Sequence, residues 1–165
     1  MKKLVIFYSF EGNTKVIAEN IALAVGADIL ELKPEKEQKP NGFLKYLWGG
    51  KQVLMRACPG LQPLDKDPRK YDLLFIGTPV WAGTYAPALR TFFSGQRFTT
   101  KKIALFCCHG GGKGTIFDKL KNALPDNQIV GEIDFQDPLK NNRAASVQRA
   151  KTWAQQLTKT IGQPG

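Results

Sequence analysis

The sequence predicts an α/β fold in which a doubly wound parallel sheet of five strands lies between two layers of helices. Two observations predict it. Short apolar runs alternate with segments of helical periodicity, which is typical of parallel strands joined by crossover helices. The length of 165 residues suits one domain, and 42% hydrophobic with 23% charged residues is an ordinary globular balance. We therefore expect residues 1–165 to form a single three-layer domain.

Five apolar runs are the expected strands, at residues 4–9, 27–32, 72–78, 102–108 and 129–135. The first run follows Lys2 and Lys3 as the apolar core of a signal peptide would, but it ends at Glu11 without a small-residue cleavage site. We therefore interpret it as a buried strand. No uncharged apolar stretch reaches the roughly 18 residues of a membrane-spanning helix, so no membrane span is expected.

The connections between these runs carry helical patterns. Apolar residues three and four positions apart predict amphipathic helices within residues 16–25, 116–124 and 147–157. Pro87 suits the first turn of a further helix that runs through Phe93. Each expected strand is thus followed by a helix or by a long connection, as a doubly wound sheet requires.

The connection over about residues 34–70 is long for a compact domain, which predicts structure of its own within this insertion. A helix is expected there, with a break at Gly49-Gly50 because two glycines disfavour a continuous helix. The apolar positions of that helix are Phe43, Leu44, Leu47, Trp48 and Leu54. Three prolines make the end of the insertion a loop.

The net charge of +10 is concentrated in two segments. Residues 33–70 carry nine Lys/Arg against four Asp/Glu, and residues 140–165 carry five Lys/Arg and no acidic residue. These segments account for the whole excess of positive charge. They form either a solubilising surface or a docking face for an acidic partner protein. Nucleic acid is disfavoured as a partner because no nucleic-acid-binding motif accompanies the charge.

The three cysteines indicate a reducing compartment. Cys58, Cys107 and Cys108 are odd in number and two of them are adjacent, which does not suit a disulfide framework. Their spacing is not that of a zinc site, and no metal is expected. We therefore expect a cytoplasmic protein in which Cys107 and Cys108 pack at the end of a strand.

The loop after the first strand is a candidate phosphate cradle. Ligands of doubly wound sheets lie beyond the carboxyl ends of the strands, and this loop joins a strand end to a helix start, where backbone N–H groups favour an anion. An ordinary helix cap at Asn13 or Thr14 is the alternative. The candidate binding residues are Ser9, Phe10, Glu11, Gly12, Asn13 and Thr14.

This loop resembles that of the flavodoxin family, in which the pattern Thr/Ser-x-Thr-Gly-x-Thr wraps the phosphate of FMN. Ser9, Gly12, Asn13 and Thr14 fit the pattern, whereas Glu11 replaces a hydroxyl donor with a carboxylate. Glu11 either points to solvent or weakens phosphate binding. The resemblance covers the order of elements along nearly the whole chain. It implies the strand order 2-1-3-4-5 and FMN as the cofactor.

The loop after the third strand offers an aromatic wall. Trp81 is flanked by small residues, and it suits stacking against an isoalloxazine ring; the alternative is an aromatic residue of the core. In the resembled family the backbone of this loop meets flavin N5, and Ala82 and Gly83 occupy the matching position. The candidate binding residues are Thr78, Pro79, Val80, Trp81, Ala82 and Gly83.

The loop after the fourth strand has four glycines within residues 110–114, a composition that suits close approach of a ligand to the main chain. The resemblance implies that this loop covers the other side of the flavin and donates to its pyrimidine edge. His109, the single histidine, either stabilises negative charge on the ring or is incidental. The candidate binding residues are Cys108, His109, Gly110, Gly111 and Gly112.

Three functions remain open at this point. The first is an electron carrier that shuttles electrons between a reductase and an acceptor, with no catalytic side chains of its own because the flavin carries the chemistry. The second is an NAD(P)H-dependent FMN oxidoreductase or quinone reductase. The third is a non-flavin binding or regulatory module on the same fold. The carrier is favoured because no nicotinamide-binding fingerprint is visible. A basic environment would stabilise reduced anionic flavin and raise its potential.

Overall fold

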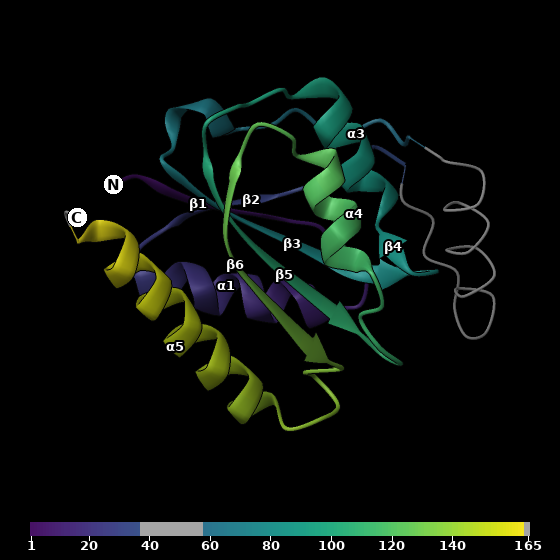
Figure 1. Ribbon diagram of the computed structural model, residues 1–165. Coiled ribbons are helices and arrows are strands. Elements are labelled where there is room, and N and C mark those ends of the chain that lie inside the picture. Colours follow the sequence, from purple (N-terminus) through teal and green to yellow (C-terminus); the bar gives the residue numbers. More distant parts are fainter. Residues whose placement is uncertain (37–57, 164–165) are drawn as a thin grey trace.

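A computed structural model describes residues 1–36 and 58–163 of the chain. Within them, five parallel strands follow the order β2-β1-β3-β5-β6, which is the predicted 2-1-3-4-5, and a two-residue strand β4 pairs antiparallel with β3. The α/β three-layer prediction is confirmed (Figure 1). The strands are β1 Lys3–Phe7, β2 Asp28–Glu31, β3 Leu73–Trp81, β4 Thr84–Tyr85, β5 Lys102–His109 and β6 Gln128–Gln136.

The inner strands are apolar on both faces because helices cover both faces of the sheet. In β1, Leu4 and Ile6 belong to one buried core cluster, whereas the alternate residues Val5 and Phe7 belong to the other. This alternation is the two-residue period of a strand. Burial on both faces explains why the sequence shows a continuous apolar run there rather than a hydrophobic and polar alternation.

Helices α1 and α5 cover one face of the sheet, and α3 and α4 cover the other (Figure 1). α1 and α5 lie side by side, and the side-chain amide of Gln155 donates a hydrogen bond to the carbonyl oxygen of Ala24 at 3.4 Å. The helices confirm the four predicted ones outside the insertion. Their bounds are α1 Asn13–Val25, α3 Pro87–Gly95, α4 Ile116–Ala123 and α5 Arg143–Gly162, with a 3₁₀ turn η1 at Pro68–Lys70.

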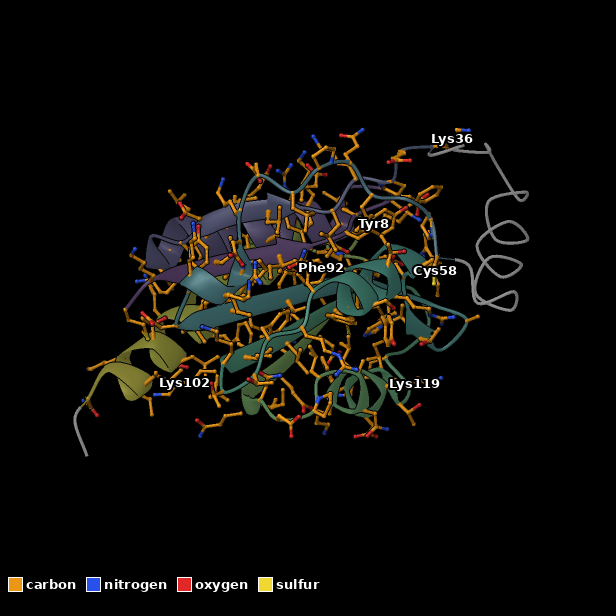
Figure 2. The ribbon with its side chains drawn as sticks, turned by 90° about the horizontal axis from the view of Figure 1, so that it is seen from above. Tyr8, Lys36, Cys58, Phe92, Lys102 and Lys119 are labelled. Atoms are coloured by element: carbon orange, nitrogen blue, oxygen red, sulfur yellow. The ribbon has the colours of Figure 1, made fainter. Side chains whose placement is uncertain are left out.

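Figure 2 shows the same layering through the side chains. Phe92 of α3 lies in the interior at 1% exposure, whereas Lys102 and Lys119 lie at the periphery. The helix predicted around Trp48 falls outside the described residues. None of the helices in the described parts is long and apolar enough to cross a membrane.

Candidate functional site

A cavity of about 360 Å³ lies at the carboxyl edge of the sheet, where four connections meet. They are the loops after β1, β5 and β6 and the hairpin formed by β3 and β4. This is the edge at which doubly wound sheets bind their ligands. The cavity is lined by Ser9, Phe10, Glu11, Asn13, Thr14, Pro79, Val80, Trp81, Ala82, Cys108, His109, Gly110, Asp137 and Lys140.

Most of the predicted site residues line this cavity, and five do not. Gly12 is the N-cap residue of α1, and Thr78 is fully buried in the sheet. Gly83 lies in the turn of the β3–β4 hairpin. Gly111 and Gly112 are exposed beyond the end of β5. The three predicted loops thus converge on one cavity, and a fourth segment, which holds Asp137 and Lys140, completes its wall.

The first loop turns sharply into α1 at Gly12. Gly12 has a φ of +93°, in the left-handed region that favours glycine, and its carbonyl oxygen accepts the first helical hydrogen bond from the Val16 amide at 3.0 Å. The Ser9 hydroxyl oxygen accepts from the Lys15 amide at 3.1 Å. The Asn13 side-chain oxygen accepts from the Leu139 amide at 3.0 Å, which ties this loop to the segment after β6.

Thr14 presents a buried hydroxyl at the start of α1. The residue is 1% exposed, and its Oγ1 makes no hydrogen bond to any residue within the described ranges. The Cys108 thiol lies nearby, but sulfur is a weak hydrogen-bond partner. The first turn of a helix also has amides without intrahelical acceptors. A hydroxyl that has no hydrogen-bond partner among the described residues, next to these amides and in the wall of a cavity, is suited to bind an anion.

The predicted second loop begins with a hairpin, which differs from our expectation of a loop that leads directly from the third strand to the next helix. β3 continues to Trp81, and its last two residues pair with Tyr85 and Thr84 of β4. The two turn residues Ala82 and Gly83 have φ values of +46° and +72°, as a type I′ turn requires. This turn matches the right-handed twist of the strands and holds the backbone of the hairpin over the cavity.

An aromatic cluster forms the wall beneath this hairpin. The Trp81 ring packs edge to face against Tyr8, with 5.7 Å between centroids, and against Phe10, with 5.4 Å. Trp81 and Phe10 both line the cavity. Because such contacts fix the orientation of a ring, they provide an ordered apolar surface for a flat ligand.

The third loop begins at His109, whose ring is hydrogen bonded to an acidic side chain. The side chain of His109 is 8% exposed, and its Nε2 lies 3.0 Å from Oδ2 of Asp134 on β6. Lys113 Nζ lies 3.1 Å from the other oxygen of the same carboxylate. Burial raises the pKa of Asp134, but the hydrogen bonds with His109 and Lys113 outweigh it and hold the pKa below its usual value. Asp134 is therefore an anion at neutral pH.

The segment after β6 was missed by sequence reasoning. The Asp137 amide donates to the His109 carbonyl oxygen at 2.9 Å, which brings Asp137 and Lys140 to the cavity. The signal available in the sequence was the position of this segment, because it follows a parallel strand and starts the basic stretch 140–165. Lys140 gives the cavity a positive charge near the start of α1.

The two adjacent cysteines point to opposite sides of β5. Cys107 belongs to the core under α3 and α4, whereas Cys108 belongs to the core under α1 and α5 and lines the cavity. Burial raises the pKa of Cys108 to about 12 and raises the pKa of Cys107 further. Both thiols are therefore protonated and unreactive at neutral pH.

The cavity wall offers two chemically distinct sets of groups. The Thr14 hydroxyl, the start of α1 and Lys140 together suit a phosphate. Trp81 and the backbone of residues 108–110 suit a planar ring with polar edges.

Comparison with known proteins agrees with this arrangement. The flavodoxin family model matches residues 2–157. A quinone-dependent NAD(P)H dehydrogenase from Gluconacetobacter diazotrophicus is 25% identical over 157 residues, which cover 81% of this chain and 71% of that protein.

Solved structures with the same fold include flavoproteins. A flavoprotein from Lactobacillus acidophilus NCFM in complex with FMN superposes with a TM-score of 0.69 at 23% identity, covering 87% of this chain and 98% of that one. Oxidised Flavodoxin 2 from Bacillus cereus superposes with a TM-score of 0.60 at 17% identity, covering 97% and 99%. These likenesses establish the fold.

Proposed function

The chain belongs to the flavodoxin family, and we propose that it binds FMN non-covalently in the cavity between its four loops and passes electrons through it. The observation that carries this proposal is the buried Thr14 hydroxyl, which lacks a hydrogen-bond partner among the described residues and lies at the N-terminus of α1. Leaving a buried hydroxyl without a partner costs about 1–3 kcal/mol. A bound phosphate would remove that cost.

The phosphate end of the site is built by the first loop. Thr14 would donate its hydroxyl hydrogen to a phosphate oxygen, and backbone amides at the start of α1 would donate beside it. Lys140 adds a positive charge from the segment after β6. Glu11 is exposed at the same cavity, which supports the interpretation that its side chain points toward the surface while its backbone N–H stays available to a phosphate.

The ring end is built by Trp81 on one side and residues 108–110 on the other. When bound, FMN supplies the one- and two-electron chemistry that these side chains lack. Trp81, fixed by Tyr8 and Phe10, would orient the ring and exclude water from one of its faces. The hairpin turn at Ala82 and Gly83 would present backbone groups to the ring edge.

The role of an electron carrier is favoured, with an acidic redox protein as the docking partner. Lys113, Lys119 and Lys140 lie in or beside the loops that form the cavity, and a positive rim would attract an acidic surface. A reducing, cytoplasmic setting suits three cysteines of which two are buried.

A second function, reduction of quinones by NAD(P)H, is favoured by one finding. The relative from Gluconacetobacter diazotrophicus is named for that activity. Anaerobic incubation of the flavin-loaded protein with NADPH separates the two. Stoichiometric oxidation of NADPH without any added reductase would favour the quinone reductase, whereas no oxidation would favour the carrier.

The binding proposal is tested by titrating the protein into FMN and, separately, into riboflavin while following flavin fluorescence. We expect a dissociation constant for FMN below about 1 μM. Riboflavin should bind about 100-fold more weakly, because it lacks the phosphate and its charge-assisted hydrogen bonds. Absence of binding to either would overturn the proposal and leave a non-flavin module on the same fold.

A further inference from the structure

In the part of the chain that the structure describes, only one of the two ring nitrogens of His109 has a hydrogen-bond partner. Its Nε2 is hydrogen bonded to Asp134, while Nδ1 is buried and makes no hydrogen bond within the described parts of the chain. The side chain is only 8% exposed, and the residue lines the cavity. A buried nitrogen without a partner is costly, so this arrangement calls for an explanation beyond packing.

The partner fixes the tautomer. An ionised carboxylate can only accept hydrogen bonds, so the hydrogen shared between Asp134 and His109 resides on Nε2. In the neutral ring, Nδ1 then carries a lone pair and is the one site at which the ring can gain a proton. The same carboxylate would stabilise the resulting imidazolium at a distance of 3.0 Å.

We propose that His109 is the proton-uptake site of this protein and binds a proton at Nδ1 when the cavity gains negative charge, with Asp134 as its positioning residue. This inference rests on the proposed binding of FMN. An external two-electron reductant such as dithionite, itself oxidised, together with one proton from the solvent, would leave the bound flavin with one added negative charge. One further proton would then pass from a hydronium ion to the lone pair of Nδ1: an O–H bond of the hydronium ion breaks, an N–H bond forms, and water is released.

Several charged groups face His109 and act on the free energy of adding a proton to its ring. Asp134 on β6 favours the protonated ring, and Lys113 competes for the same carboxylate from the loop after β5. On the α5 side, Arg149 donates to the Asp134 carbonyl oxygen. Asp137 hydrogen bonds through its amide to the His109 backbone, and Lys140 and Glu11 line the same cavity. A negative charge gained in the cavity would act on the His109 ring in the same direction as Asp134 does.

The test uses the fact that the chain has one histidine. Protein labelled with ¹⁵N-histidine is saturated with FMN, and its imidazole signals are followed by NMR against pH, first oxidised and then reduced with dithionite. We expect the signals to report hydrogen on Nε2 in the oxidised protein. On reduction, the midpoint of the His109 titration should move up by about one pH unit, a tenfold gain in proton affinity.

Three variants make the result specific. Asp134→Asn should abolish most of the upward movement, whereas Asp118→Asn, which removes an exposed carboxylate on α4, should leave it intact. In His109→Gln, the midpoint potential should lose the part of its pH dependence that follows the His109 titration. The same titration midpoint in oxidised and reduced protein, with FMN bound, would overturn this proposal alone. A protein that fails to take up FMN would instead overturn the proposed function and this inference with it.

Discussion

Lys119 holds the turn of the β3–β4 hairpin from outside, because its Nζ donates a hydrogen bond of 2.7 Å to the Gly83 carbonyl oxygen. The lysine belongs to α4, so this contact links the tip of the hairpin to the helical layer that covers the sheet. Lys119 lies at the periphery in Figure 2, and the hydrogen bond is exposed to solvent. We expect it to restrain local motion more than it stabilises the whole fold.

Replacing Lys119 by Met should therefore loosen the hairpin without unfolding the protein. The free energy of unfolding should fall by less than about 1 kcal/mol, the usual net value of one hydrogen bond. Amide hydrogen exchange within residues 81–85 should become about fivefold faster. Lys159→Met, which removes an exposed lysine from the last turn of α5, is the control and should leave this exchange unchanged. Equal rates of amide hydrogen exchange in residues 81–85 of the two variants would contradict the expectation that Lys119 restrains the hairpin.

The Thr14 hydroxyl should affect apo and loaded protein in opposite ways. Thr14→Val keeps the shape of the side chain and removes a buried hydroxyl that has no hydrogen-bond partner among residues 1–36 and 58–163, so the free energy of unfolding of the apo protein should hold or rise by about 1 kcal/mol. The affinity for FMN should fall about tenfold or more, and the affinity for riboflavin should not change. Thr158 has a hydroxyl that donates to the Ala154 carbonyl within α5, and Thr158→Val should leave both affinities unchanged. A Thr14→Val protein that binds FMN normally would refute the role of this hydroxyl.

Gly77 of β3 is covered by the ring of Phe106, its register partner on β5, which leaves no room for a side chain. A Cβ there would come within 2.0 Å of the Phe106 ring, which is fully buried. Gly77→Ala should therefore lower the free energy of unfolding by about 3 kcal/mol through overpacking. Gly95→Ala, at the end of α3, meets nothing within 4 Å and should be neutral or stabilising. Urea denaturation of both variants checks the contrast, and similar midpoints would contradict it.

Much of the fold could be predicted because the apolar pattern of each strand has one physical cause. Alternate residues of β1 enter two different cores, so both faces must be apolar, and the run is visible in the sequence. The hairpin was not visible, because Ala82 adopts a positive φ that alanine rarely takes and so gives no turn signal. The pairing with β4 overrides that local preference.

The pair of His109 and Asp134 was hidden for a different reason. The two residues lie on adjacent strands, and their approach depends on register. A β-bulge between Ile103 and Ala104 shifts the register of β5 against β6 by one residue, so that Asp134 lies opposite Cys107. Since a shift of one residue exchanges the two faces of a strand, no periodicity in the sequence could place this carboxylate beside the cavity.

The cysteines should differ sharply in reactivity. Cys58 is exposed, whereas Cys107 and Cys108 are buried, and burial raises the pKa of both thiols well above neutrality. Iodoacetamide at pH 7 should therefore label one thiol of the native protein and all three in urea, as counted by mass spectrometry. Cys58→Ser should reduce native labelling to near zero. Rapid labelling of Cys108 in the folded protein would show that the cavity wall opens.

Stability at high pH should depend on Tyr71, whose hydroxyl donates a hydrogen bond of 2.7 Å to Asp28 on the edge strand β2. Burial, together with this hydrogen bond, raises the pKa of Tyr71 to about 12 from its ordinary value of 10.0. The folded state holds this proton more tightly than the unfolded state does. Tyr71 therefore contributes fully to the free energy of unfolding below pH 10, and this contribution is lost as the pH rises toward 12.

Comparison with Tyr71→Phe isolates this contribution, since other tyrosines and lysines titrate in the same range. Between pH 9 and pH 11.5 the original protein should lose more free energy of unfolding than Tyr71→Phe, as measured by urea denaturation at each pH. The control is Tyr85→Phe, which replaces a tyrosine packed edge to face against Phe93. This variant should lose as much free energy of unfolding over the same pH range as the original protein. An equal loss in Tyr71→Phe would mean that the Tyr71 proton is no better held in the folded chain than in the unfolded one.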